Sequence, residues 1–486
     1  MQTLEAPVLT AEHLTDADIT AAIELVLTTQ PGLATQPIAV ATRQGIVELT
    51  GTVDHLLARA RAEELALAVR GVRAVLNGLA VAAVAVPDSE LYLNVGRALA
   101  DDPTARDYNL RHAVADGTVT LTGTVQWWPE KQLALRLVQG VRGVRRIIDS
   151  PLTVRGGELP KADEDITTQL REQLEWDIRV NKNQVQVRTT DRVVHLAGAV
   201  RSAAAKARIV ALAEQAGAAR VDARALVVAR SVLAPVPERA ECAPPADADI
   251  AQAVREVFRR DPRLAAFQPL VQVHEGAVTV AGTVGSLCAR DAAAEAARHV
   301  VGVWQVHNLL KVRPDRFWPD ADIRQRLADA LRRDPYLHGF ELSVNVLSGK
   351  SYLYGRVDSY FEQEQAAGVA AAITGVVEVE NRISVPGDGV ATADALAGHL
   401  TGNLALPAPL PPACQDCDLA ERIRARYFWS ASLHGQPVEV QAHHGRVSLT
   451  GFVDTWLDRH EAAATARELG ARDVNNHLRI RFEPAH

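Results

Sequence analysis

Hydrophobic and polar residues alternate in short runs that recur along the whole chain. In the first clear run, Val47, Leu49 and Val53 alternate with polar residues, and this period of two predicts a strand with one buried face. An apolar segment at 38–42 precedes the run and is joined to it through Gly45. Glycine tolerates the positive φ of a tight turn, so the two segments predict a β-hairpin.

The stretch that follows the first hairpin has helical periodicity. Residues 54–69 place Leu57, Leu65 and Val69 at helical spacing, and Gly71 then supplies a helix-stop signal. A third strand is predicted over 75–81, because apolar residues return there after the glycine. The helix between the second and third strands is a crossover connection.

A second kind of amphipathic stretch precedes each hairpin. It begins near an acidic residue, such as Asp247 or Asp320, whose charge opposes the positive end of a helix. Three of these stretches run into Asp-Pro, at 102–103, 261–262 and 334–335, where proline stops the helix. The predicted unit is therefore α-β-β-α-β.

This unit recurs six times, as Gly-x-Val-x-Leu-x-Gly-x-Val, an Ala-rich stretch, and Gly-Val-x-x-Val-x-Asn-x-Leu-x-Val. The second glycine of the pattern falls at 51, 123, 198, 282, 355 and 451. The spacing between successive glycines in this list is longer than a solenoid repeat and matches the length of a small independent domain. We therefore predict an α+β chain of six tandem α-β-β-α-β domains, each a three-stranded mixed sheet with two helices on one face.

The predicted domains cover 16–84, 88–156, 163–230, 247–313, 319–386 and 417–482, with a Pro- and Ala-rich linker over 387–416. The glycines predicted to serve as structural turn residues are Gly45, Gly51, Gly117, Gly123, Gly276, Gly282, Gly349, Gly355, Gly445 and Gly451. The third copy diverges, because Arg192 stands at its turn and Ala223 replaces the Asn found at 77, 308, 381 and 476. That Asn is expected to satisfy nearby backbone groups, with ion ligation through its carbonyl as the alternative.

Composition narrows the classes of function. The chain of 486 residues has 52 basic and 59 acidic residues and a net charge of −7, which argues against a nucleic-acid binder held by net charge. No apolar run reaches the length of a transmembrane helix, and the N-terminus lacks the pattern of a signal peptide. With only four cysteines, a disulfide framework is not expected. The expected compartment is therefore the cytoplasm.

The repeated pattern resembles the BON domain, a family named for bacterial osmotically inducible and nodulation proteins. Six copies of the spaced glycines and strand residues span nearly all of residues 16–482. The resemblance implies the same α-β-β-α-β order. It also implies association with phospholipid or the cell envelope, protection in osmotic stress and, in one member, potassium binding.

Aromatic residues, only 5% of the chain, gather at the start of the second helix in three copies. The predicted lipid or partner contacts are Trp127, Trp128, Tyr360, Phe361 and Trp456. A ring at this position can pack on its own domain, lie between domains, or enter a lipid interface. The residues alone leave these three alternatives open.

Motifs for catalysis or metal binding are not recognised in the sequence, so no catalytic residue, metal or cofactor is predicted. Cys414 and Cys417 form a CxxC without a second pair, and zinc, a disulfide and plain thiols remain open for them. Arginine clusters at 142–146 and 255–263 could meet anionic head groups or be solvated faces.

The sequence thus favours a non-catalytic, multivalent binding or scaffold protein of stress or envelope-homeostasis type. Its expected partners are anionic phospholipid surfaces or proteins, and several weak domains in tandem would add avidity. The alternative is a soluble potassium-responsive or chaperone-like osmotic-stress protein. The oligomeric state and the arrangement of the six domains are left open.

Overall fold

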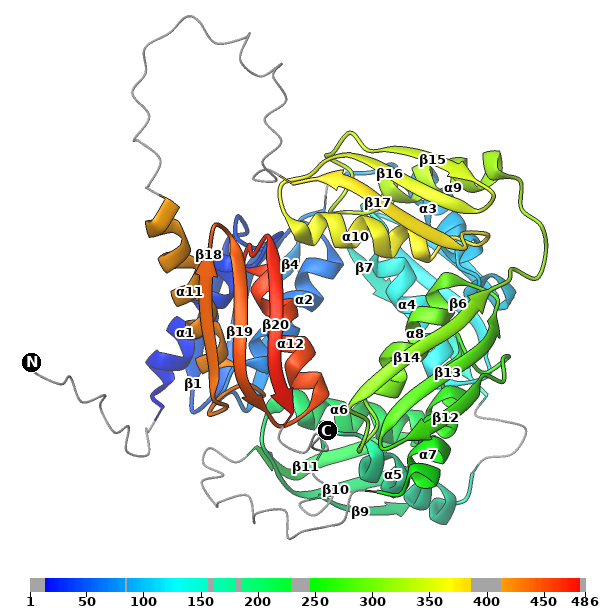
Figure 1. Ribbon diagram of the computed structural model, residues 1–486. Coiled ribbons are helices and arrows are strands. Elements are labelled where there is room, and N and C mark those ends of the chain that lie inside the picture. Colours follow the sequence, from blue (N-terminus) through cyan, green and yellow to red (C-terminus); the bar gives the residue numbers. More distant parts are fainter. Residues whose placement is uncertain are drawn as a thin grey trace, which may run out of the picture.

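The computed structural model describes residues 14–83, 85–155, 161–180, 185–228, 245–385 and 412–480, of which 412–415 are described by their backbone only. Within these ranges the chain folds into six α-β-β-α-β domains, which confirms the predicted fold class (Figure 1). We call them domains 1 to 6 in chain order. Residues 387–411 of the predicted linker lie outside the described residues, and 412–416 belong to a helix.

The first three domains have the following elements. Domain 1 contains α1 (Asp16–Thr29), β1 (Ile38–Arg43), β2 (Ile46–Val53), α2 (Leu56–Ala68), β3 (Ala74–Asn77) and β4 (Ala80–Val81). Domain 2 contains α3 (Asp88–Asp101), η1 (Ala105–Asp107), β5 (Asn109–Ala115), β6 (Thr118–Val125), α4 (Trp128–Gln139), β7 (Arg146–Ile148) and β8 (Leu152–Val154). Domain 3 contains α5 (Asp163–Trp176), β9 (Val185–Thr190), β10 (Val193–Val200), α6 (Ala203–Ala216) and β11 (Arg220–Val228).

The last three domains repeat this order. Domain 4 contains α7 (Asp247–Arg260), β12 (Leu270–His274), β13 (Ala277–Val284), α8 (Leu287–Arg298) and β14 (Gln305–Val312). Domain 5 contains α9 (Asp320–Arg333), β15 (Ser343–Leu347), β16 (Lys350–Arg356), α10 (Tyr360–Ala371) and β17 (Glu378–Ser384). Domain 6 contains α11 (Pro412–Trp429), β18 (Val438–His443), β19 (Arg446–Val453), α12 (Trp456–Glu468) and β20 (Asp473–Ile480).

Every sheet has the second strand of the hairpin at its centre. In domain 4, β13 pairs antiparallel with β12 and parallel with β14, and the other domains follow the same order. Alternate residues of the central strand, such as Val278 and Val280, are fully buried against the two helices. Alanines on the second helix, such as Ala293 and Ala297, complete that core. Each domain thus has a small core of its own, built with few aromatic rings.

One aspartate ties the first helix to the hairpin turn in every domain. In domain 4 the two carboxylate oxygens of Asp247 accept hydrogen bonds from the N–H groups of Glu275 and Gly276, at 2.8 and 2.9 Å. The same pair of bonds is made by Asp16, Asp88, Asp163, Asp320 and Asp416. The sequence assigns these aspartates to the helix end alone, and the structure adds this second role.

The repeated asparagine satisfies backbone groups, as expected. In domain 4 the Asn308 amide donates to the carbonyl oxygen of Arg290 in α8, and its Oδ1 accepts the N–H of Leu310. Domains 1, 5 and 6 make the equivalent bonds. Domains 2 and 3 lack this asparagine, and their third strands slip by one residue against the central strand.

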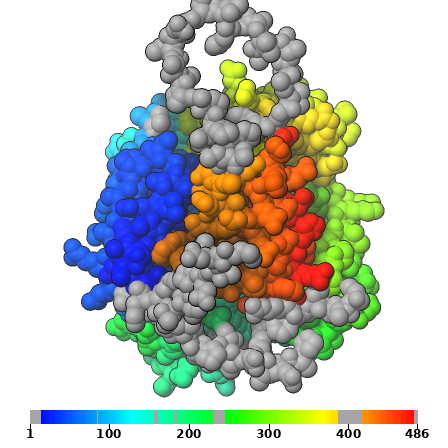
Figure 2. Space-filling model, turned by 60° about the vertical axis from the view of Figure 1, so that its left-hand side comes forward, coloured from blue at the N-terminus to red at the C-terminus, as the bar shows by residue number. Residues whose placement is uncertain are grey.

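The end of a first helix meets the end of a second helix in another domain, and this contact joins the domains in pairs. Between domains 3 and 4, Ile178 N–H donates to His299 C=O and Val301 N–H donates to Trp176 C=O. The bridge Val69–Ser430 joins domains 1 and 6 in the same antiparallel way. Figure 2 shows these two domains side by side, in blue and orange.

Domains 2 and 5 pair with one hydrogen bond in each direction. Thr374 N–H donates to Asp101 C=O, and Arg142 N–H donates to Arg333 C=O. The second bond of each bridge is absent here because Pro103 and Pro335 stand where domains 3 and 6 have a residue with an N–H group.

Further contacts join domains 1 to 3 to one another, and likewise domains 4 to 6. Helix α6 packs on α2 and α4, and α10 packs on α12. Leu56 of domain 1 packs on the core of domain 2, and Leu287 of domain 4 on the core of domain 5. The six domains therefore form one body in which helices lie toward the inside and sheets toward the outside (Figure 1). None of the helices among the described residues combines the length and apolar character needed to cross a membrane.

Candidate functional site

Exposed apolar side chains lie on the outer faces of all six sheets. In β14, Leu310 is buried under the helices while its neighbour Leu309 is 61% exposed on the opposite face. The same alternation exposes Leu347 beside buried Val346, and Phe452 beside buried Val453. The outer-face residues of this kind are Ile46 and Leu76 in domain 1, Ile148 in domain 2, Val227 in domain 3, Leu270 and Leu309 in domain 4, Leu347 in domain 5 and Phe452 in domain 6. We call this set the outer apolar residues.

Polar residues accompany the outer apolar residues, and the outer face of domain 5 combines aromatic and charged groups. Tyr352 and Tyr354 stand on β16, with the guanidinium of Arg382 5.7 and 5.8 Å from their ring centres. Lys350 forms ion pairs of 2.9 Å with Glu378 and Glu380. A face that combines rings, apolar side chains and paired charges can contact another macromolecule, but offers no enclosed pocket for a substrate.

The aromatic residues predicted as lipid or partner contacts lie in three different domains. Trp127 precedes the first residue of α4 and is 46% exposed, while Trp128 is half-buried. Tyr360 packs on the core of domain 5. Trp456 packs on the core of domain 6 and lies 4.7 Å below the guanidinium of Arg298 from domain 4. These residues do not form one continuous site, and their assignment to lipid or partner contact stays a prediction.

Phe361 takes part in a junction between domains 5 and 1. Its ring meets Tyr336 edge to face at 4.9 Å, and Tyr336 meets His55 of domain 1 at 4.5 Å. The Nδ1 atom of His55 accepts the N–H of Ala58, so His55 also caps α2. Burial lowers the pKa of His55 to about 4. Burial also raises the pKa of Asp334, two residues before Tyr336, to about 6.

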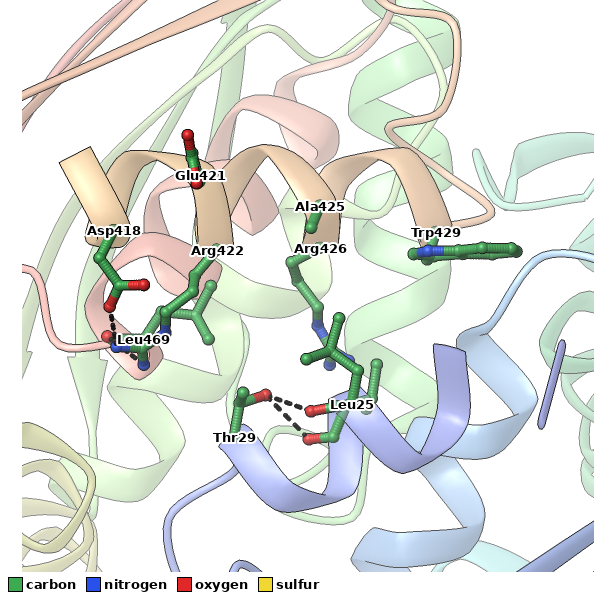
Figure 3. Close-up of a pocket in the computed structure, with 10 residues that line it drawn as sticks. Leu25, Thr29, Asp418, Glu421, Arg422, Ala425, Arg426, Trp429 and Leu469 are labelled. Atoms are coloured by element: carbon green, nitrogen blue, oxygen red, sulfur yellow. Dashed lines mark hydrogen bonds and ion pairs between the residues drawn. The ribbon is translucent and has the colours of Figure 1, made fainter. Parts of the chain in front are cut away.

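A small apolar groove lies between α1 and α11, where domains 1 and 6 meet (Figure 3). Its volume is about 210 Å³, and Leu25, Ala425 and Trp429 contribute to its walls. Arg422 borders the groove, donating to Leu469 C=O at 3.1 Å and facing Asp418 at 3.7 Å. The groove is part of the interface of this domain pair.

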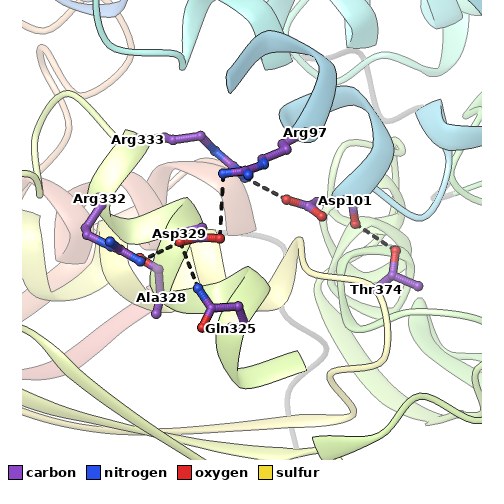
Figure 4. Close-up of polar contacts among 8 residues, drawn as sticks. All are labelled: Arg97, Asp101, Gln325, Ala328, Asp329, Arg332, Arg333 and Thr374. Carbon is purple, nitrogen blue, oxygen red and sulfur yellow. Dashed lines mark hydrogen bonds and ion pairs between the residues drawn. The ribbon is translucent and has the colours of Figure 1, made fainter. Parts of the chain in front are cut away.

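Charged residues organise the junction of domains 2 and 5 (Figure 4). Arg333 at the end of α9 donates through Nη2 to Asp101 Oδ2 at 2.7 Å, and both side chains are almost fully buried. The carbonyl of Asp101 also accepts the Thr374 hydroxyl at 2.7 Å. Asp329 lies 3.8 Å from Arg97 of α3 and forms a second ion pair with Arg332. Oppositely charged side chains of the two domains thus pair across this junction.

The last residue of the first helix differs from domain to domain, and sequence reasoning missed its role. At this position domains 1 and 6 have Thr29 and Trp429, domains 2 and 5 have Asp101 and Arg333, and domains 3 and 4 have Trp176 and Arg260. Trp429 packs on the core of domain 1, and Trp176 on the core of domain 4. Aligning the six copies would have shown a tryptophan or a charged residue just before the helix stop in five of them.

Groups that could support metal binding are absent from the part of the chain that the structure describes, where no three His, Cys, Asp or Glu residues converge. Cys288 and Cys417 are free thiols, and Cys417 is exposed. The side chains of Cys414 and Cys242 lie outside the described residues. The described side chains therefore give no geometry for the CxxC pair.

A family model described as BON domain matches residues 15–83, 87–156, 162–230, 246–314, 319–387 and 415–481. Among solved structures, the chain is similar to the C-terminal domain of CdsD, the structural protein of the type III secretion system of Chlamydia trachomatis. That likeness has 13% identity and a TM-score of 0.12, and covers 49% of this chain and 99% of that chain. A second structure of CdsD matches with 13% identity and a TM-score of 0.12, over 48% of this chain and 92% of that chain. No curated protein matches the chain.

Proposed function

The chain belongs to the BON domain family, and from this premise we propose that it is a non-catalytic, multivalent scaffold of stress or envelope-homeostasis type that binds protein partners through its outer sheet faces. BON domains occur in stress-related and envelope-associated proteins and are generally not catalytic. Phospholipid surfaces are the alternative class of partner that these outer faces could bind.

The observation that carries the proposal is the presence of outer apolar residues on every sheet. Leu309 and Leu347 are each more than 60% exposed, and no neighbouring domain covers them. The sheets lie around the outside of one body, as Figure 1 shows. A planar membrane can touch only the faces on one side of such a body, whereas separate protein partners can occupy several faces together. The arrangement therefore favours protein partners, with avidity when one partner spans two faces.

The test compares the full chain with a variant in which Leu76, Leu309 and Leu347 are changed to serine. These side chains are exposed, so the substitutions should change stability by only about 0.5 kcal/mol each. The expected result is loss of most partners recovered by in-cell crosslinking and mass spectrometry. Phe317→Ser is the matched control, because Phe317 is 89% exposed but lies outside the strands.

Two outcomes would contradict the proposal. Recovery of the same crosslinked partners by the triple variant would show that the outer faces are not used. Flotation of the wild type with phosphatidylglycerol vesicles, abolished by Trp127→Ala and unaffected by the triple variant, would assign the protein to lipid binding instead.

A further inference from the structure

A cavity of about 380 Å³ lies at the junction of domains 2 and 5, away from the outer sheet faces. Helix α3 contributes Glu90, Asn94 and Arg97 to its wall, and α9 contributes Asp329, Arg332 and Arg333. Arg142, which follows α4, and His338, which follows α9, complete the polar lining. Since one water takes roughly 30 Å³ in the liquid, the cavity has room for a small polyatomic ligand.

Positive charge exceeds negative charge in this lining. Four arginines face two carboxylates, Glu90 and Asp329. Asp329 already pairs with Arg97 and Arg332, and Asp101 pairs with Arg333 from behind the cavity wall. Counting Asp101 with the two lining carboxylates still leaves one positive charge in excess, and arginines gathered at one cavity repel one another unless an anion joins them.

Two guanidinium groups at the cavity also have buried N–H donors that no acceptor among the described residues satisfies. Arg333 is 8% exposed and uses Nη2 on Asp101, but its Nη1 is buried without a hydrogen-bond acceptor. The Nε of Arg142 is likewise buried without a hydrogen-bond acceptor. A buried charged donor left without an acceptor costs more than roughly 1–3 kcal/mol, so both arginines are held beside the cavity at an energetic cost. These two atoms have almost no accessible surface, so a ligand would be bound by the other N–H groups of the lining arginines.

The backbone holds these two arginines together. Arg142 N–H donates to Arg333 C=O at 2.9 Å, across the boundary between the two domains. The two guanidinium groups therefore start from residues fixed to each other, and the ion pair with Asp101 fixes Arg333 further. A site assembled in this way is organised before a ligand arrives, which lowers the entropy cost of binding.

We propose that this cavity binds a multiply charged oxyanion of the phosphate class, with N–H groups of the arginines that line it, Arg142 among them, donating to its oxygens. Guanidinium groups suit this ligand because their N–H groups match the spacing of phosphate oxygens. The ligand would contact both domains, and its binding would stabilise their pairing. Free phosphate and the phosphate of a lipid head group offer the same chemistry.

The experiment is titration calorimetry of the full chain with inorganic phosphate and pyrophosphate, at ionic strength matched with sodium chloride. The wild type should bind and should melt at a higher temperature in phosphate than in chloride. Arg142→Gln should weaken binding about tenfold or more, because one charge-assisted hydrogen bond and one charge are lost. Arg146→Gln is the control, since Arg146 is exposed and lies outside the cavity lining.

A parallel arm uses vesicles of phosphatidylglycerol, with phosphatidylcholine vesicles as reference. Binding of free phosphate that depends on Arg142 supports a soluble ligand, and binding of phosphatidylglycerol vesicles that depends on Arg142 supports a lipid source. Equal titrations of wild type and Arg142→Gln in both arms would overturn the proposal. This result would leave the scaffold function intact, because the outer apolar residues are not part of the cavity.

Discussion

The repeated aspartate at the start of the first helix shows how one residue sets local structure in all six domains. Its carboxylate accepts two adjacent N–H groups of the hairpin turn, which have no partner in the hairpin ladder itself. Both turn residues have positive φ, with Glu275 at 50° and Gly276 at 75°. Such a turn needs external hydrogen bonds, and the helix start supplies them.

Replacing this aspartate should loosen a domain far more than replacing its neighbour. We expect Asp247→Ala to destabilise domain 4 by about 1.5–3 kcal/mol, because it removes two hydrogen bonds to an ionised acceptor. Asp249→Ala is the control, since Asp249 is exposed in the same helical turn. Hydrogen exchange of the Glu275 and Gly276 amides measures the effect locally. Equal exchange in the two variants would contradict this role.

At the scale of one element, the helix cap formed by His55 differs from the caps of the other domains. The second helices of domains 3 and 4 are capped by Ser202 and Ser286, whose hydroxyls accept the N–H three residues on. In domain 1 the imidazole Nδ1 of His55 accepts that bond and the ring also contacts Tyr336 of domain 5. Protonation of Nδ1 would remove the acceptor and place a charge in the junction.

This cap should make the stability of the domain 1–domain 5 junction depend on pH. Burial lowers the pKa of His55 from 6.5 to about 4, so the unfolded state binds the proton first as pH falls. The contribution of the neutral ring is complete above pH 6.5 and is lost as pH falls toward 4, by roughly 2–3 kcal/mol. Thermal melting of wild type and His55→Ser over pH 4–7.5 measures this loss.

His55→Ser should keep the cap, lower the melting temperature near neutral pH, and flatten its dependence on pH. His299, whose pKa burial also lowers to about 4, should leave a residual slope. His274→Ser is the control at an exposed position. A slope in His55→Ser equal to that of wild type would exclude His55 as a source of the pH dependence.

The elements of each domain follow from local sequence, whereas their mutual arrangement does not. Alternating Val47 and Leu49 and the stop at Asp102-Pro103 identify strands and helix ends directly, because these signals act within one segment. The division of the third strand in domain 1 at Gly78 was not predicted, since 75–81 reads as one apolar run. Arg192, at φ 59°, shows that the turn conformation persists without glycine when the aspartate bonds remain.

The candidate sites depend on contacts between distant segments, so the sequence predicted little of them. Arg142 and Arg333 are separated by most of three domains, and nothing in either segment indicates that they meet. The starts of α4, α10 and α12 carry aromatic residues, but only neighbouring domains decide whether such a ring is exposed, as at Trp127, or placed under Arg298, as at Trp456.

The domain pairs are nested along the sequence of the whole molecule. Domain 3 pairs with domain 4, domain 2 with domain 5, and domain 1 with domain 6. Each pair joins a different combination of side chains at the helix ends, such as Asp101 with Arg333. Exchange of partners would place Trp429 against a charged residue instead of Thr29 or would separate Asp101 from Arg333, which penalises incorrect pairings. The order of the chain and the chemistry of the helix ends therefore select the same assembly.

Domain 6 should stay bound when its covalent connection to domain 5 is cut. It is held by the backbone bridge Val69–Ser430, by the ion pair of Arg61 with Glu468 at 2.9 Å, and by Trp429 on the core of domain 1. Arg298 on Trp456 adds a contact with domain 4. These contacts resemble a protein–protein interface with an aromatic anchor, and such anchors contribute most of the binding energy.

The test inserts a protease recognition site into the predicted linker before the start of α11, within 387–411, and cleaves the purified protein. Size-exclusion chromatography with light scattering should show one particle of the mass of the intact chain. Trp429→Ala should release domain 6, because truncation of an anchoring tryptophan costs about 2–4 kcal/mol, or a 30- to 1,000-fold loss of affinity. Trp127→Ala, at an exposed ring of domain 2, should leave the cleaved particle whole. If the cleaved wild type separated into two species, the tandem covalent order rather than the helix-end contacts would hold domain 6 in place.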